Sequence, residues 1–97
     1  MTLNIIIVFA QTNVMRYEKI YVGIKARFLS EGGMRPFELI WRDGRRFSID
    51  KVKFIERAPA KSGGVLVKRY TVVMDGLERY LFYDKENERW FVEKKVL

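Results

Sequence analysis

The chain has 97 residues, of which 48% are hydrophobic and 14% aromatic, a composition typical of one globular domain with a single core. It contains neither cysteine nor histidine, which excludes disulfides, thiolate catalysis and cysteine metal sites and removes the commonest general base near neutral pH. Nineteen basic residues against twelve acidic ones give a net charge of +7, which favours anionic partners, although many small proteins carry such a charge for solubility alone. A cytoplasmic location fits this composition.

Residues 1–16 are predicted to be an N-terminal extension of a single all-β domain that spans residues 17–97. The apolar run Leu3–Ala10 carries no charged side chain. It is too short for a membrane-spanning helix, which needs about 20 apolar residues, and it lacks the basic start of a secretory signal. We therefore expect no membrane partner. Two interpretations stay open: an extra strand or short helix that covers apolar surface, or an upstream extension with the natural start at Met15.

The segment Lys19–Phe28 alternates between apolar and mostly polar residues. This period of two predicts a half-buried strand with a basic outer face. The turn-forming residues Ser30–Gly33 end the strand. Its inward residues are predicted to be Ile20, Val22, Ile24, Ala26 and Phe28.

The dipeptide Asp43-Gly44 lies between two apolar runs and predicts a hairpin, because tight turns need a positive φ that glycine adopts freely. A three-residue loop that pairs Trp41 with Phe47 and Leu39 with Ile49 keeps the apolar side chains on one face. Since a one-residue slip would move every side chain to the other face, the odd loop is favoured.

The next segment is predicted to bend and then to break. The alternation changes phase at Asp50-Lys51, which predicts a β-bulge of the kind that bends a strand around a barrel corner. The run Ala58–Gly64, with its proline and two glycines, then predicts a loop between strands.

Two further turns predict the last three strands. The dipeptide Asp75-Gly76 forms the first turn, and an even loop there pairs Tyr70 with Leu81. A longer polar turn follows and pairs Tyr83 with Trp90. Together these elements predict an all-β fold, a five- or six-stranded antiparallel meander that closes into a small SH3-like barrel or roll. The predicted core residues are Trp41, Phe47, Ile49, Val72, Leu81 and Trp90.

The candidate site combines a basic stretch with an aromatic face. The stretch Arg57–Tyr70 holds four basic residues and no acidic residue. Alternation places aromatic residues of the last two strands next to it, as a platform on which unpaired bases stack. Two alternatives stay open, because small barrels bury aromatic residues on both sides and the N-terminal segment is apolar enough to cover this face. The candidate nucleic-acid-binding residues are Arg57, Lys61, Lys68, Arg69, Tyr80, Phe82 and Phe91.

Catalysis has little support in the sequence. The serines have no histidine partner, and no cofactor or metal site is expected. The loop Lys61–Gly64 resembles a phosphate cradle but lacks the Walker spacing. The sequence therefore predicts a binding module that is not an enzyme, with nucleic acid as its partner. The alternative is a protein-interaction module or a homodimeric structural protein without nucleic-acid binding.

Several short motifs are shared with a known group of proteins. They are Trp41-x-Asp43-Gly44-x-x-Phe47-x-Ile49-Asp50-x-Val52, Ser62-Gly63-Gly64-Val65, Lys68-Arg69-Tyr70-Thr71, Tyr80-Leu81-Phe82 and Trp90-Phe91-Val92-Glu93. From about Lys19 to Lys94 the chain resembles a family of small uncharacterised bacterial proteins, and more loosely a domain of unknown function attached to some translesion-type DNA polymerases. The looser similarity implies an accessory role in DNA transactions. It defines no functional residue that can be carried over.

Overall fold

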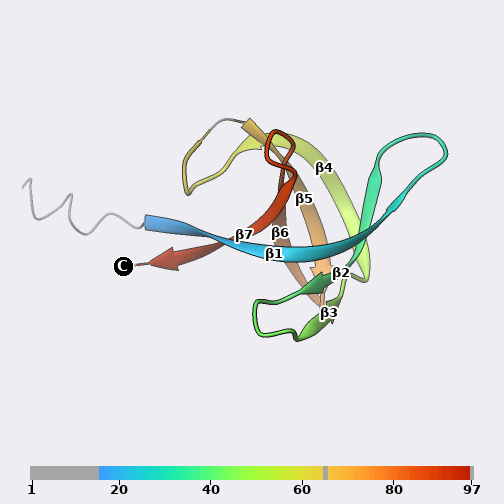
Figure 1. Cartoon of the computed structure of the whole chain (residues 1–97), viewed down its shortest axis with the longest axis horizontal. Helices are drawn as coiled ribbons and strands as arrows, with labels where there is room; N and C mark the ends of the chain where they lie inside the picture. The colour runs from blue at the N-terminus through green and yellow to red at the C-terminus, as the bar shows by residue number, and fades with distance from the viewer. Residues whose placement is uncertain (1–15, 65, 97) are drawn as a thin grey trace, which may run out of the picture.

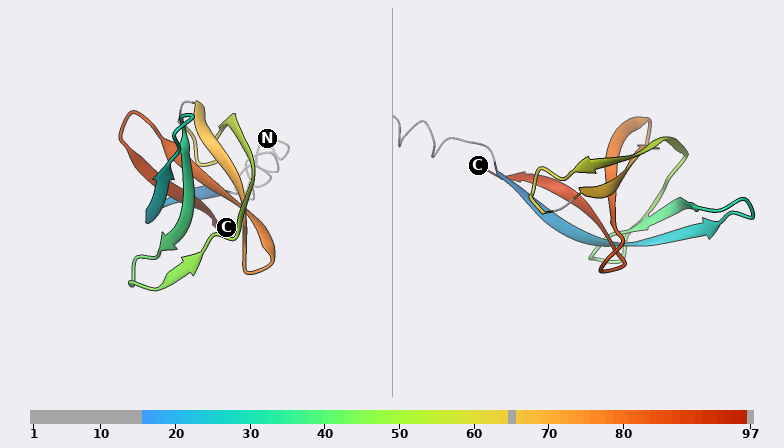
Figure 2. Two further views of the ribbon diagram at one scale, coloured as in Figure 1. Left: turned by 90° about the vertical axis from the view of Figure 1, so that its right-hand side faces the viewer. Right: turned by 90° about the horizontal axis from the view of Figure 1, so that it is seen from above.

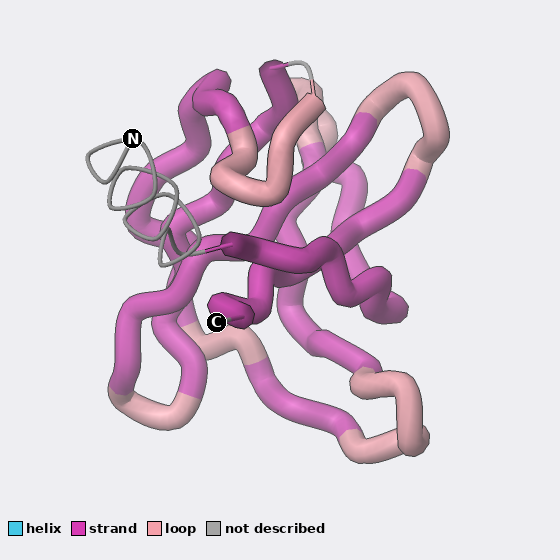
Figure 3. The backbone as a smooth tube through the Cα atoms, turned by 90° about the vertical axis from the view of Figure 1, so that its left-hand side faces the viewer, coloured by secondary structure: helices cyan, strands magenta, loops and turns pink. Residues whose placement is uncertain are grey.

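Seven antiparallel strands make up the part of the chain that the computed structural model describes, residues 16–64 and 66–96, and this part contains no helix (Figure 1). The strands are joined by loops alone (Figure 3). The all-β fold class is thus confirmed, with seven strands in place of five or six. Residues 1–15, which include most of the predicted extension, lie outside the described residues. The strands are β1 (Arg16–Phe28), β2 (Met34–Ile40), β3 (Arg46–Ser48), β4 (Lys51–Pro59), β5 (Leu66–Met74), β6 (Leu77–Asp84) and β7 (Arg89–Val96).

The strands form one curled sheet in the order β3-β2-β1-β7-β6-β5-β4 (Figures 1 and 2). Its two edge strands, β3 and β4, follow each other in the chain. Between them, the N–H of Ile49 donates to the carbonyl of Phe37 at 2.9 Å and the N–H of Asp50 donates to the carbonyl of Val73 at 2.8 Å. Two consecutive residues thus bind opposite arms of the sheet, which curls it into the predicted barrel-like roll.

The long strand β1 changes partner at Gly23. Arg16–Val22 pair with β7, and Gly23–Phe28 pair with β2. A side chain at Gly23 would place its Cβ 3.3 Å from the Cβ of Ile40, so glycine allows the close approach of β2. Beyond this point β1 and β2 form a two-stranded ribbon, in which Leu39 and Pro36 are still buried and whose end projects from the body (Figure 2).

Two clusters of buried side chains form the core, one on each face of the sheet. The larger one lies inside the curl and consists of Leu39, Ile49, Tyr70, Val72, Met74 and Leu81. The smaller one lies on the other face and consists of Ala60, Val67, Phe82 and Phe91. We call these faces the inner and the outer face.

The predicted core is partly confirmed. Ile49, Val72 and Leu81 are buried as predicted, whereas Trp41 and Trp90 are half-buried and pack against the larger cluster. The prediction for Phe47 was wrong, because it lies on the short edge strand β3 and is 38% exposed. Phe28 was also predicted to point inward, but it is 82% exposed because the ribbon carries it beyond the core.

The hairpin of β2 and β3 has a loop of the predicted length, but its strands pair in a different register. The N–H of Trp41 donates to the carbonyl of Arg45 at 2.8 Å, which leaves a three-residue loop whose Gly44 has a φ of 91°. Leu39 pairs with Phe47, two residues away from the predicted pairing. A shift of two residues leaves each side chain on its face, so the pattern of apolar residues could not reveal the error.

The remaining registers agree better with the prediction. Tyr70 pairs with Leu81 and Tyr83 with Trp90, as expected. The bulge in β4 was predicted at Asp50-Lys51 but lies between Val52 and Phe54. The segment predicted as a loop from Ala58 onward is also shorter, since β4 continues to Pro59 and pairs with β5 throughout.

Candidate nucleic-acid interface

Five adjacent strands align two neighbouring rows of directly opposed residues, one row on each face of the sheet. Successive residues of a strand point to opposite faces, so a shift of one residue on every strand moves from one row to the other. In the order β1, β7, β6, β5, β4 the outer row is Tyr21, Phe91, Phe82, Arg69 and Glu56. In the same order the inner row is Val22, Trp90, Tyr83, Lys68 and Arg57.

The two phenylalanines of the outer row belong to the core. Phe91 and Phe82 are 0% and 2% exposed, and their rings stack with centroids 5.1 Å apart. Ala60 and Val67 pack with them in the smaller cluster, and the ammonium group of Lys19 lies 5.2 Å from the ring of Phe91. The predicted stacking platform at Phe82 and Phe91 was therefore wrong, because no base can reach these rings.

The outer row ends in an ion pair. Arg69 Nη2 lies 2.5 Å from Glu56 Oε1, and the hydrogen bond to Glu56 holds the pKa of Arg69 above its ordinary value. The same guanidinium lies 4.4 Å from the ring centroid of Tyr80, which is half exposed. The guanidinium of Arg69 thus has a carboxylate and an aromatic ring as partners on its own face of the protein.

The inner row ends differently. The half-buried rings of Trp90 and Tyr83 pack with centroids 4.7 Å apart, and Tyr70 packs against Trp90 at 5.0 Å, where burial raises the pKa of its hydroxyl. Lys68 and Arg57 follow directly opposite each other. Among the described residues, no carboxylate lies within 4.0 Å of either cation. Like charges in directly opposed positions destabilise a sheet, and such local exceptions are typical of functional sites.

A groove of about 440 Å³ runs past the cationic end of the inner row, and we call it the mouth groove. Arg57, Lys68 and Lys85 supply three positive charges, and Glu88 is the one acidic residue among its lining. Tyr83 presents an aromatic surface in the groove. The remaining lining is mostly apolar and comes from Phe28, Gly33, Met34, Leu66 and Val67. The groove thus combines aromatic and apolar walls with an excess of positive charge.

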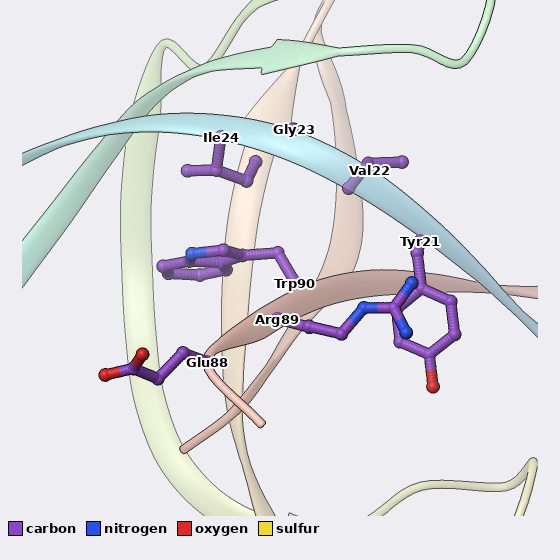
Figure 4. Close-up of a pocket in the computed structure, with 7 residues that line it drawn as sticks. All are labelled: Tyr21, Val22, Gly23, Ile24, Glu88, Arg89 and Trp90. Carbon is purple, nitrogen blue, oxygen red and sulfur yellow. The ribbon is translucent and has the colours of Figure 1, made fainter. Parts of the chain in front are cut away.

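A smaller hollow of about 370 Å³ lies where β1 leaves β7 (Figure 4). The indole of Trp90 faces Ile24 there, and the guanidinium of Arg89 lies 3.4 Å from the ring centroid of Tyr21. Glu88 lines both this hollow and the mouth groove. Trp90 lines the hollow while its ring contacts Tyr83, a wall of the mouth groove, so it connects the two.

The turn between β6 and β7 lies beside both the mouth groove and the smaller hollow. Asp84 organises it, since its carboxylate accepts hydrogen bonds from the side-chain amide of Asn87 at 2.8 Å and from the N–H of Glu86 at 3.1 Å. The bond from Asn87 is the main cause that holds the pKa of Asp84 below its ordinary value. The turn therefore keeps Lys85 and Glu88 beside the groove through a charged, hydrogen-bonded carboxylate.

The structure divides the four predicted cations. Arg57 and Lys68 meet in the inner row, Arg69 lies on the outer face, and the ammonium of Lys61 lies 5.1 Å from the ring of Tyr17. Consecutive positions of one strand must face opposite sides, so the sequence alone separates Lys68 from Arg69. Tyr83, Trp90 and Lys85 were missed as site residues, although the predicted pairing of Tyr83 with Trp90 placed these two rings together.

The loop between β4 and β5 is held by the rest of the protein. The ammonium of Lys19 donates a hydrogen bond to the carbonyl of Gly63 at 2.7 Å, and the N–H of Ser62 donates to the carboxylate of Glu93. A carboxylate thus already occupies a donor of the loop that resembles a phosphate cradle. In the described part of the chain, no three acidic residues gather as a metal site, and no helix is long and apolar enough to cross a membrane.

Comparison with protein-family models, curated proteins and solved structures found no match to this chain. The resemblance to small bacterial proteins therefore stays a prediction.

Proposed function

We propose that this protein is a non-enzymatic module that binds single-stranded nucleic acid in the mouth groove. The observation that carries the proposal is the inner row, where two contacting aromatic rings lead directly to two cations that no described carboxylate neutralises. Proteins that bind single strands combine aromatic surfaces for the bases with a basic groove for the phosphates. The net charge of +7 adds long-range attraction to such a ligand.

The residues of the groove set the expected energetics. Arg57, Lys68 and Lys85 provide three phosphate contacts, so log affinity should fall with log salt at a slope of about −2, since each contact on a single strand contributes about −0.7. Stacking of one base on Tyr83 should contribute about 1–3 kcal/mol at every salt concentration, because stacking is not ionic. The two contributions are therefore separable by a salt series.

The test is a titration of a dye-labelled oligonucleotide, followed by fluorescence anisotropy across a salt series. The double variant Arg57→Gln, Lys68→Gln should bind more weakly at low salt and flatten the slope by about 1.4. Tyr83→Leu should weaken binding by the same factor at each salt concentration. In a Trp41→Phe background, Trp90 is the single tryptophan, and its fluorescence should change on binding because its ring contacts Tyr83.

The matched control removes two positive charges elsewhere. Lys94 and Lys95 are exposed on β7, at the other end of that strand from the groove. The variant Lys94→Gln, Lys95→Gln has the same net charge as the groove variant and should keep most of the affinity and the full slope. Equal weakening by the two double variants, or no binding by the unchanged protein at low salt, would contradict the proposal.

A second candidate function is homodimerisation through β4. This strand lies at the edge of the described sheet, and its neighbouring residues Phe54 and Ile55 are 60% and 48% exposed. An apolar edge strand is a template for pairing with another chain, although the bulge at Lys53 and the proline at Pro59 oppose it. Light scattering should decide: a dimer that Phe54→Lys converts to a monomer supports this function, and a monomer at all concentrations contradicts it.

A further inference from the structure

The ribbon formed by β1 and β2 has two faces of different chemistry. Phe28 and Met34, which pair with each other, line the mouth groove. Their neighbours Arg27 and Arg35 also pair with each other and point to the opposite face, because successive residues alternate. The ribbon thus has one face in the mouth groove and a pair of arginines on its back.

The pair Arg27 and Arg35 is a second place where like charges lie directly opposite each other. Both residues are exposed, and among the described residues no carboxylate lies within 4.0 Å of either one. The guanidinium of Arg27 lies 5.2 Å from the ring centroid of Phe37, which holds it against the strand surface. An anion that binds between the two arginines would relieve their mutual repulsion.

The segment that contains the ribbon and the β2–β3 hairpin is basic as a whole. Between Gly23 and Ser48 the chain has six basic and three acidic residues. Glu38, one of the acidic ones, is already shared by Lys25 at 3.7 Å and Arg46 at 3.5 Å. This leaves Arg27 and Arg35 as the cations available on the projecting end of the ribbon.

The shape of the ribbon decides which anion fits. A two-stranded β-ribbon fits the major groove of a nucleic-acid duplex, where its cations reach the phosphates. The segment Gly23–Phe28 spans about 20 Å at a rise of about 3.3 Å per residue, which corresponds to about six base pairs at about 3.4 Å per step. Over this length the back of the ribbon is exposed at Lys25, Arg27 and Arg35, whereas Leu39 and Pro36 on its front are buried, and the end of the ribbon projects from the body (Figures 1 and 2).

We infer that the back of the β1–β2 ribbon, through Arg27 and Arg35, binds a nucleic-acid duplex, so that the preferred ligand is a junction between a duplex and a single strand. This inference rests on the proposed function, which places the single strand in the mouth groove. Because Phe28 and Met34 line that groove, a strand that leaves it passes the ribbon directly.

The experiment compares three dye-labelled ligands: a single strand, a blunt duplex, and the same duplex with a single-stranded tail. The unchanged protein should bind the tailed duplex about tenfold more tightly than either of the others. The variant Arg27→Gln, Arg35→Gln should bind the tailed duplex only as well as the single strand, with a salt slope flatter by about 1.8, since each duplex phosphate contributes about −0.9. Its affinity for the single strand should not change.

The outcomes separate this inference from the proposed function. Single-strand binding that depends on Arg57 and Lys68, without any preference for the tailed duplex, overturns the junction and leaves the proposed function standing. The absence of single-strand binding overturns both. The variant Lys94→Gln, Lys95→Gln should keep the preference for the junction, and its loss there would show that the preference reflects net charge alone. Circular dichroism melting checks that each variant is folded.

Discussion

The outer and inner rows cross the same five strands, one residue apart, yet they differ in charge and in burial. In both, two contacting aromatic rings on β7 and β6 are followed by a cation on β5. They differ on β4, where the outer row has Glu56 and the inner row has Arg57. In the outer row, the carboxylate of Glu56 forms an ion pair with the opposite cation, Arg69. The inner row instead ends in two directly opposed cations, and no described carboxylate lies within 4.0 Å of either one.

Burial follows the same division. The rings of Phe82 and Phe91 are covered by Ala60 and Val67, so the outer row contributes its apolar surface to folding. Trp90 and Tyr83 stay half-buried at the end of the sheet where β1 leaves β7 and pairs with β2. The comparison teaches that aromatic composition alone does not identify a binding face. What distinguishes the two faces is the charge at the end of the row and the cover over its rings.

The largest effect is expected from removing an aromatic ring of the outer row. Phe91→Ala empties a fully buried position and should cost about 3–5 kcal/mol of unfolding free energy, a large part of the stability of a small domain. Trp90→Ala should cost less, because the half-buried ring leaves a space that water can fill. Urea unfolding of the two variants measures both costs. A greater loss for Trp90→Ala would contradict the assignment of the rows.

The second prediction converts the inner row to the pattern of the outer row. Arg57→Glu places a carboxylate opposite Lys68, as Glu56 lies opposite Arg69. The variant should be more stable by less than about 1 kcal/mol, since the position is exposed. It should also bind single strands at least about tenfold more weakly at low salt, because one phosphate contact is lost and a repulsion is gained. A variant that is more stable and binds with full strength would show that the inner row is no binding site.

Removing the carboxylate from the outer row should change stability only slightly and should leave binding unchanged. Glu56→Gln removes the partner of Arg69 and should cost at most about 1 kcal/mol, because the carboxylate is half exposed and its charge is screened. The loss should shrink as salt is raised. Affinity for nucleic acid should not fall, since Arg69 lies on the other face from the groove. Thermal melting at two salt concentrations and one anisotropy titration test these statements.

The sequence predicted the fold better than the site, for a physical reason. Alternation and Asp-Gly turns determine which residues share a face, and so the pairings of Tyr70 with Leu81 and of Tyr83 with Trp90 were correct. The same pattern does not say which face a curled sheet covers. Phe82 and Phe91 were therefore assigned to an open platform, whereas the residues that cover them come from the β4–β5 hairpin.

The ribbon could not be predicted for a related reason. Lys19–Phe28 alternates without a break, so it was expected to be one strand, and the pattern says nothing about a change of partner. The change of partner at Gly23 depends on the close approach of Ile40, which is a tertiary contact. The bulge between Lys25 and Ala26, which leaves Phe37 exposed, depends on the same pairing.

The smallest expected effect concerns the turn between β6 and β7, which lies beside both the mouth groove and the smaller hollow. Hydrogen bonds from Asn87 hold the pKa of Asp84 below its ordinary value of 3.8. A carboxyl group with a lower pKa in the folded state stabilises the fold above its unfolded pKa, and this contribution is lost as the pH falls through the folded value. Asp84→Asn should therefore be slightly less stable than the unchanged protein at neutral pH, and the difference should shrink below about pH 4. Urea unfolding at several pH values measures it, and a difference that grows with acid would contradict the role of the charge. Binding near neutral pH should tighten slightly, because the substitution removes a negative charge next to Lys85 in the mouth groove.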